Sequence, residues 1–179
     1  MLLARHGLES FHVEPLRIRH GQLRVWIGHR GARPIEPSVV RQEALERAAG
    51  LDRREVYIQL AARAERVRAE LRRELQAMKL RGATVAGYGA PAKASTLAAY
   101  CGLGPQDLPW IADRNRLKHG RFTPGTHIPI TGVERIDEDR PEALLLFAWN
   151  FTEEIMAQLA DYRSAGGRFL IPVPEVRHV

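Results

Sequence analysis

Residues 84–93, with the sequence TVAGYGAPAK, contain the pattern that decides the fold. A strand-like apolar run ends in Gly-x-Gly-x-x-Ala, and a helix-forming run from Lys93 to Tyr100 follows directly. This is the layout of a phosphate-binding turn between a strand and a helix. In that pattern Gly87 permits the tight turn, Gly89 lets a diphosphate approach the backbone, and Ala92 lets the helix pack closely on the strand. Glycine-rich strand ends also occur as plain packing turns, so that alternative stays open.

Strand and helix signals alternate through the rest of the chain. A helix is predicted from Thr152 to Ser164, with Thr152 as its cap, and the unbroken apolar run at 143–148 is typical of a parallel strand buried on both faces. Further strands are predicted at residues 109–113, 126–130 and 168–173. The sequence therefore predicts an α/β fold with a Rossmann-like open parallel sheet of about five strands. Ligands bind such sheets at the carboxyl ends of the strands.

The part of the chain before this sheet shows other patterns. A β-hairpin is predicted, with strands Ser10 to Ile18 and Leu23 to Gly28 joined by a turn at His20-Gly21. Two helices should follow, from Ser38 to Ala49 with Ser38 as the cap, and from Arg53 to Leu80. The predicted organisation is a hairpin segment at 1–36, a helical connector at 37–81, and a Rossmann-like domain at 82–179.

The long helix has one narrow apolar stripe with steps of three and four residues. Its members are Leu60, Ala64, Val67, Leu71, Leu75 and Met78. Packing of this stripe on the helix's own domain is the favoured interpretation. A homodimer through Arg53–Leu80 is the alternative.

Composition excludes several classes of protein. No apolar run approaches the roughly 20 residues of a membrane span, and Met1-Leu2-Leu3 is too short for a signal-peptide core, which favours a cytoplasmic protein without a membrane partner. The net charge is +6, with 17 basic and 10 acidic residues in 1–82 but 10 basic and 11 acidic in 83–179. Because the excess lies mostly along a helix without stacking aromatics, we expect no nucleic-acid partner. The single Cys101 excludes an internal disulfide and a cysteine-rich zinc site.

Several uncommon strings follow the glycine-rich run in order. They are Asp113-Arg114, Lys118-His119-Gly120-Arg121, the run PGTHIPI at 124–130, Ala148-Trp149-Asn150-Phe151 and Gly166-Gly167-Arg168-Phe169. Together with 87–93 they resemble the C-terminal domain of S-adenosylmethionine-dependent sugar C-methyltransferases over about residues 52–179. The hairpin from Leu2 to Gly28 is similar to the last two strands of that family's central domain. The resemblance therefore implies that 1–36 is the remnant of a methyltransferase domain and that 82–179 is a nucleotide-sugar-binding domain.

The resemblance implies a three-part family architecture. A cysteine-rich zinc domain comes first, a central methyltransferase domain binds S-adenosylmethionine, and a Rossmann-like C-terminal domain holds the nucleotide of a deoxysugar. This chain has neither the cysteines nor a second glycine-rich loop upstream of Gly87. We therefore expect a C-terminal fragment with no catalytic residue, metal ligand or cofactor of its own, whose partners are a nucleotide-linked deoxysugar and a missing upstream methyltransferase domain.

The resemblance also implies a set of nucleotide-binding residues. Backbone N–H groups from Tyr88 to Lys93 would meet the diphosphate, and Asp113 would accept a deoxyribose hydroxyl. Trp149 would stack on a base, and Asn150 would bond its edge or the sugar. The full set is Gly87, Tyr88, Gly89, Ala90, Pro91, Ala92, Lys93, Asp113, Lys118, Arg121, Trp149 and Asn150.

Plainer alternatives remain for these residues and for the whole chain. In the alternative interpretation, Asp113 caps a turn, Trp149 belongs to the core, and the basic loop at 114–121 is solvated. For the chain, a free-standing NAD(P)-binding oxidoreductase-like domain and a structural dimerisation module are the other hypotheses.

Overall fold

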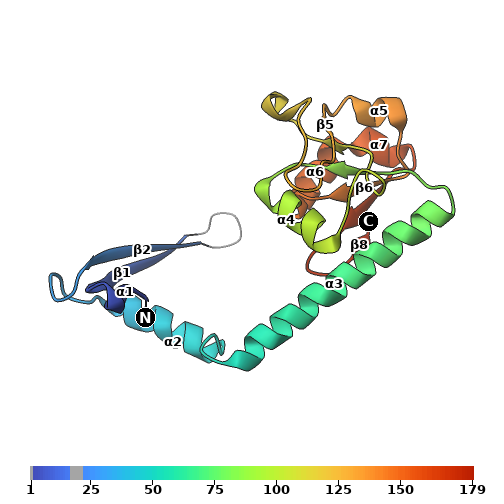
Figure 1. The fold of residues 1–179 in the computed structure, drawn as a ribbon. Helices are drawn as coiled ribbons and strands as arrows, with labels where there is room; N and C mark the ends of the chain where they lie inside the picture. The colour runs from blue at the N-terminus through green and yellow to red at the C-terminus, as the bar shows by residue number, and fades with distance from the viewer. Residues whose placement is uncertain (1, 17–21) are drawn as a thin grey trace. The chain divides into compact units, whose positions relative to one another are not determined.

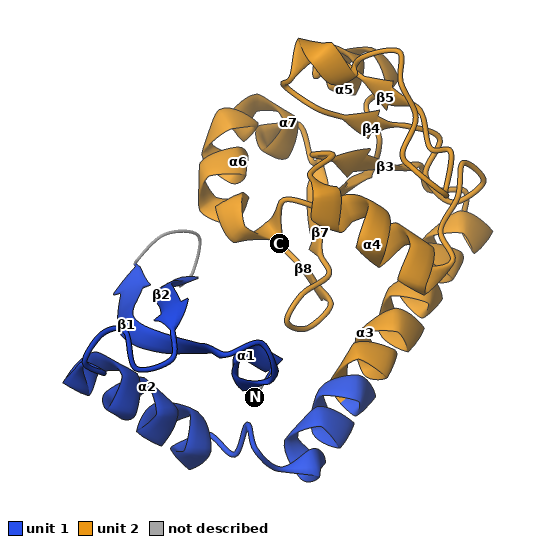
Figure 2. Ribbon diagram, turned by 60° about the vertical axis from the view of Figure 1, so that its left-hand side comes forward, with its two compact units in different colours: residues 1–62 blue, residues 63–179 orange. Residues whose placement is uncertain are grey.

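The computed structural model describes residues 2–16 and 22–179, which form two compact units (Figures 1 and 2). The first unit spans residues 1–62 and the second residues 63–179. The division at 36 and 81 that the sequence suggests stays a prediction.

The first unit is built around an antiparallel hairpin (Figure 1). Helix α1 (Leu2–Arg5) leads into β1 (Leu8–Leu16), which pairs with β2 (Gln22–His29), and helix α2 (Pro37–Ala48) follows. The pairing shifts register between Ser10 and His12. The predicted hairpin is confirmed, whereas its turn at His20-Gly21 and the end of its first predicted strand lie outside the described residues.

Helix α2 begins without the cap that the sequence suggests. Pro37 occupies its first turn, where a missing N–H is harmless, and Glu36 is the residue before it. Ser38 is not the cap: its Oγ accepts a hydrogen bond from the Val13 N–H at 3.1 Å. The hydroxyl therefore ties the helix to β1, and the prediction of a Ser38 cap was wrong.

Helix α3 (Arg54–Leu80) begins one residue later than predicted and runs from the first unit into the second. In the second unit Leu71, Leu75 and Met78 are buried in the core. Leu60, in the first unit, is 55% exposed. The carboxyl-terminal half of the stripe thus packs on its own unit, as the favoured interpretation predicts. The homodimer stays a prediction.

The second unit contains a mostly parallel six-stranded sheet, which confirms the predicted α/β class. Its strands are β3 (Val85–Tyr88), β4 (Ile111–Ala112), β5 (Ile130–Thr131), β6 (Ala143–Leu146), β7 (Arg168–Ile171) and β8 (Arg177–His178). Their order is β5-β4-β3-β6-β7-β8, and β8 is antiparallel to β7. The chain starts at β3, builds outward through β4 and β5, and then returns to the other side of β3 with β6. The direction of winding therefore changes between β3 and β6, which is where open α/β sheets bind ligands.

Helices cover both faces of this sheet. Val85 packs in a core with α3 and α4 (Ala92–Cys101). The next residue, Ala86, packs on the opposite face. There the helices are α5 (Arg135–Asp139), α6 (Thr152–Gln158) and α7 (Ala160–Ser164). Burial on both faces explains why β6 is an uninterrupted apolar run.

Two predicted elements differ from those observed, and one observed strand was not predicted. The strand predicted at 126–130 starts only at Ile130, because His127 has a φ of 55° and turns the chain. The helix predicted from Thr152 to Ser164 is interrupted at Leu159 (φ −106°, ψ 35°). Thr152 is not its cap but lies inside α6 and donates to the Trp149 carbonyl at 2.6 Å. Strand β8 was not predicted, because two residues at a sheet edge show no periodicity.

None of the helices in residues 2–16 and 22–179 combines the length and the apolar character needed to cross a membrane.

Candidate functional site

The turn after β3 is made by Gly89 rather than by Gly87. Gly89 has a φ of 80°, and a Cβ there would lie 2.9 Å from the Ala148 Cβ. Gly87 lies within β3, where a Cβ would come within 2.6 Å of the Ile111 side chain. The role predicted for Gly87 was therefore wrong: its missing side chain makes room for the neighbouring strand. Gly89 has the conformation that glycine adopts most readily.

Ala92 does not provide the predicted close packing between helix and strand. Its side chain is exposed at the start of α4. Ala94 and Ala98 supply that packing instead, since both are buried in the core formed with α3. Helix α4 begins four residues after β3 ends at Tyr88, so its first turn follows the carboxyl end of that strand. Its N-cap is Pro91, and no side chain caps the first N–H groups.

Lys93, Trp149 and Asn150 meet at the switch point of the sheet. Lys93 lies in the first turn of α4 after β3, and the other two lie in the short 3-10 helix η2 (Trp149–Phe151) after β6. The Lys93 ammonium donates to the Asn150 Oδ1 and lies 3.9 Å from the centre of the Trp149 ring. We call these three residues the switch-point cluster. The structure thus brings together three of the predicted site residues from neighbouring strands.

The Lys93 ammonium forms no ion pair with a carboxylate within the described ranges 2–16 and 22–179. Burial lowers the pKa of Lys93, because removal from water disfavours the ammonium form. An anion beside this ammonium would reverse that shift, so the cluster is electrostatically suited to a negatively charged ligand.

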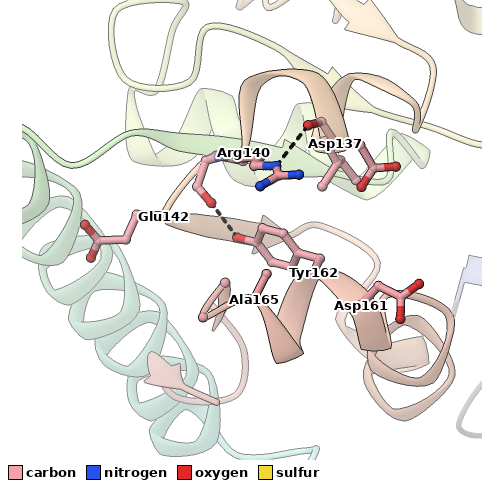
Figure 3. A pocket seen from close by; sticks show the side chains of 10 residues that line it. Asp137, Arg140, Glu142, Asp161, Tyr162 and Ala165 are labelled. Carbon is pink, nitrogen blue, oxygen red and sulfur yellow. Dashed lines mark hydrogen bonds between the residues drawn. The ribbon is translucent and has the colours of Figure 1, made fainter.

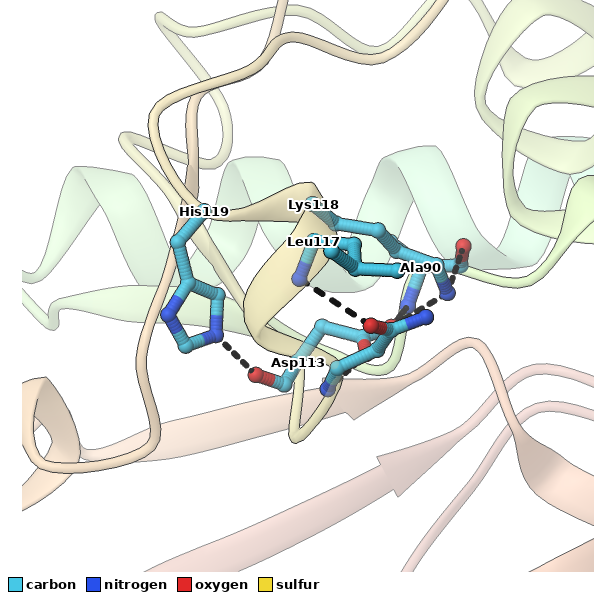
Figure 4. Close-up of polar contacts among 6 residues, drawn as sticks. Ala90, Asp113, Leu117, Lys118 and His119 are labelled. Atoms are coloured by element: carbon cyan, nitrogen blue, oxygen red, sulfur yellow. Dashed lines mark hydrogen bonds and ion pairs between the residues drawn. The ribbon is translucent and has the colours of Figure 1, made fainter.

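Asp113 and Lys118 form a second cluster with Ala90, beside the β3–α4 turn (Figure 4). The Asp113 Oδ2 accepts hydrogen bonds from the Ala90 N–H at 2.7 Å and from the Lys118 ammonium at 2.9 Å. Lys118 also donates to the Ala90 carbonyl at 3.0 Å. Asp113 Oδ1 accepts from the Asn115 N–H at 2.8 Å. We call Ala90, Asp113 and Lys118 the clamp.

The environment of Asp113 favours its ionised form. The residue is only 8% exposed, and burial alone would raise its pKa. The N–H groups of Asn115 and Ala90 and the Lys118 ammonium outweigh burial and hold the pKa of Asp113 below its usual value. The hydrogen bonds of the Asp113 carboxylate are therefore made within the protein. These contacts fit the alternative interpretation, in which Asp113 caps a turn.

Arg121 and Tyr88 belong to neither cluster. Arg121 is exposed, and its hydrogen bonds in the structure are those of its backbone. Tyr88 is buried on the sheet face covered by α6, and burial raises the pKa of its phenol. In the turn itself, the Gly89 N–H donates to the Ala112 carbonyl and the Ala90 N–H to Asp113. Of the N–H groups predicted to meet a diphosphate, those of Ala92 and Lys93 remain for a ligand.

Sequence reasoning missed two residues, Asn115 and His119, that support the clamp. The Asn115 side chain accepts a hydrogen bond from the Leu117 N–H at 3.0 Å, and the His119 ring donates to the Asp113 carbonyl at 2.6 Å (Figure 4). The spacing Asp-x-Asn-x-Leu was the available signal, because Asp and Asn side chains bond the backbone two residues on. Two such turns follow each other here. His119 gave no signal of its own.

A pocket lies away from these clusters, at the amino ends of β6 and β7 (Figure 3). It has a volume of about 260 Å³ and is lined by Arg140, Glu142 and Tyr162 among others. The Tyr162 hydroxyl is already used, since it donates to the Pro141 carbonyl at 2.9 Å. Because ligands of open α/β sheets bind at the carboxyl ends, we do not place the site here.

No group of three or more side chains suited to holding a metal ion occurs in the part of the chain that the structure describes.

Comparison with known proteins identifies the family. Residues 17–174 match the family model for the C-methyltransferase C-terminal domain. The chain belongs to this family. It is also 38% identical over 177 residues to C-methyltransferase NovU of Streptomyces niveus. That alignment covers 98% of this chain and 42% of the relative, so the chain spans about two fifths of that relative's length. The predicted resemblance is confirmed at the level of the family.

Proposed function

We propose that the second unit binds the diphosphate of a nucleotide-linked deoxysugar and serves as the nucleotide-binding part of a C-methyltransferase. The observation that carries the proposal is the Lys93 ammonium, which lies at the switch point between β3 and β6 without a carboxylate partner in the described residues. Membership of the C-methyltransferase family supports the reaction class.

The amino terminus of α4 supplies the other half of the proposed phosphate site. The first N–H groups of a helix have no acceptor within the helix, and the helix dipole makes this end positive. In α4 these include the N–H groups of Ala92 and Lys93, while the Ala94 N–H turns back to the Pro91 carbonyl at 2.8 Å. A diphosphate at this position would meet backbone donors and the ammonium together.

Trp149 and Asn150 orient Lys93 in this proposal. One face of the Trp149 ring faces the ammonium, which favours this placement over stacking of that face on a base. Asn150 accepts from Lys93 through Oδ1, so its amide N–H groups remain for a phosphate or sugar oxygen. Both residues would thus hold the cation toward the crevice.

The clamp disfavours the nicotinamide alternative. A dinucleotide site needs an acidic residue after the second strand to accept ribose hydroxyls. Asp113 is that residue, and its carboxylate already accepts from three donors. The same objection applies to S-adenosylmethionine. We propose that this cofactor and zinc bind to other parts of family members, and that this chain alone transfers no methyl group.

A titration calorimetry series tests the proposal. Thymidine diphosphate, thymidine, NAD and S-adenosylmethionine are titrated into the parent protein and into Lys93→Ala. We expect the parent to bind the diphosphate, and the variant to bind it roughly ten- to a hundredfold more weakly, since a charge-assisted hydrogen bond contributes about 1.5–3 kcal/mol. Lys79→Ala is the matched control, because Lys79 bonds a backbone carbonyl elsewhere.

Three results would contradict the proposal. Absence of diphosphate binding by the parent would remove it altogether. Tighter binding of NAD than of thymidine diphosphate would favour the oxidoreductase-like alternative. Equal affinity of parent and Lys93→Ala would place the phosphates elsewhere.

A further inference from the structure

Both backbone groups of Ala90 are held by side chains from the β4–β5 connection. Its N–H donates to Asp113 and its carbonyl accepts from Lys118, at 2.7 and 3.0 Å. Ala90 is the residue between the Gly89 turn and the N-cap Pro91. The clamp therefore fixes the peptide through which the chain enters α4.

The groups that hold Ala90 are themselves fixed. The carboxylate of Asp113 is bonded to the Asn115 N–H, and the Asp113 carbonyl accepts from His119. The Lys118 side chain is about one third exposed, and its charge is neutralised by Asp113 at 2.9 Å. An ammonium group has three donors, and two of them are engaged here. The charges of Asp113 and Lys118 thus compensate each other, whereas Lys93 has no carboxylate partner among the described residues.

We propose that Asp113 and Lys118 are positioning residues that hold the β3–α4 turn in its ligand-binding shape and do not themselves contact the nucleotide. This inference rests on the proposed function. It assigns phosphate contact to Lys93 and the start of α4, and it removes Asp113 from recognition of the deoxyribose and Lys118 from recognition of the phosphates. The arrangement makes ligand affinity depend on residues outside the contact surface.

Hydrogen exchange in the ligand-free full chain tests the mechanical part. The exchange rate of the Ala90 amide is measured by NMR for the parent, Asp113→Asn and Lys118→Met. We expect each substitution to raise that rate at least tenfold, because each removes a partner from the clamp. Arg121→Met is the matched control on the same connection and should leave the rate unchanged. An unchanged rate in both clamp variants would overturn the proposal.

Calorimetry with chosen ligands separates positioning from contact. Thymidine diphosphate and its 3′-deoxy analogue are titrated at low and high salt. If the two residues act by positioning, Lys118→Met should lower the affinity for thymidine diphosphate while the affinity keeps the parent's salt dependence. Asp113→Asn should leave the ratio of the affinities for the two ligands unchanged. The double variant should bind thymidine diphosphate no more weakly than the weaker single variant, because both substitutions disrupt the same clamp and their effects should not add.

The opposite pattern would overturn the inference. If Lys118→Met flattens the salt dependence while Ala90 exchange stays at the parental rate, Lys118 contacts phosphate directly. If Asp113→Asn abolishes discrimination against the 3′-deoxy analogue, Asp113 binds the sugar. If the parent binds no thymidine diphosphate, the proposed function fails, and Ala90 exchange still decides whether the clamp holds the turn.

Discussion

Lys93 and Lys118 lie at the carboxyl end of the same sheet, yet their ammonium groups have opposite surroundings. Lys118 is paired with Asp113 and bonded to the Ala90 carbonyl. The Lys93 ammonium donates to an amide oxygen and lies over an aromatic ring, without a carboxylate partner among the described residues, and burial lowers its pKa. The difference teaches that two lysines at the same edge of a sheet have different tasks. The neutralised one stabilises the turn, and the other is suited to meet an anion.

Loss of the clamp carboxylate should have the largest effect on stability. Asp113→Asn leaves Lys118 without its counter-charge and weakens the bonds from Ala90 and Asn115. We expect the free energy of unfolding at neutral pH to fall by about 2–4 kcal/mol. Urea titration followed by circular dichroism measures it, with Asp137→Asn, a substitution of an exposed residue of α5, as the control. A loss below about 0.5 kcal/mol, the range of ordinary surface substitutions, would contradict the role given to the clamp.

The pH dependence of stability sharpens the same point. The pKa of Asp113 is lowered in the folded protein, so between that value and the ordinary value of about 3.9 the unfolded state binds more protons. The stabilisation is therefore complete above roughly pH 5 and is lost as the pH falls through the folded pKa. The difference between parent and Asp113→Asn should be constant at neutral pH and shrink below about pH 4. A difference that is the same at every pH would show that the charge does not matter.

A pair of matched lysine substitutions compares the two clusters directly. Lys118→Met should lower the free energy of unfolding by about 1–3 kcal/mol, because it leaves Asp113 with an uncompensated charge. Lys93→Met should change it by less than about 1 kcal/mol, since it removes a weak cation–π contact along with the cost of burying the ammonium. Thermal unfolding of both variants under identical conditions measures the contrast. Equal losses would abolish the distinction drawn between the clusters.

The aromatic support of Lys93 should have the smallest effect. Trp149→Leu removes the ring 3.9 Å from the ammonium and should weaken thymidine diphosphate by about two- to fivefold, because a partly exposed cation–π contact is worth roughly 0.5–1 kcal/mol. Phe151→Leu, an exposed neighbour on the same 3-10 helix, serves as the control. An equal loss of affinity for uncharged thymidine would show instead that the ring stacks on the base.

The sequence was sufficient for the elements with strong local patterns. The Gly-x-Gly turn, the apolar β6 and the long helix ending at Leu80 all follow from periodicity and from glycine placement. The two-residue β8 and the break at Leu159 could not be predicted, because neither has a local signature. The sequence also could not show that a side chain at position 89 would strain the fold. That strain follows from the φ of 80° at Gly89 and from the nearby Ala148.

The candidate site was predicted as a set of residues, but not as two clusters. The order of motifs placed Asp113 and Trp149 after the ends of predicted strands, and the structure finds them after β4 and β6. Residue type alone could not show which lysine would be neutralised. That depends on the β3 turn lying against the β4–β5 connection, a contact between residues more than twenty positions apart. Tertiary hydrogen bonds therefore decided the roles.

The most direct measurement is the pKa of the Lys93 ammonium, followed by NMR in the free protein and with thymidine diphosphate. The chain has three lysines, Lys79, Lys93 and Lys118, so the Lys93 side-chain signal can be assigned by single substitutions. We expect the pKa of Lys93 to lie below its ordinary value in the free protein and to rise when the diphosphate binds. Binding of the diphosphate with no change in the pKa of Lys93 would contradict the account.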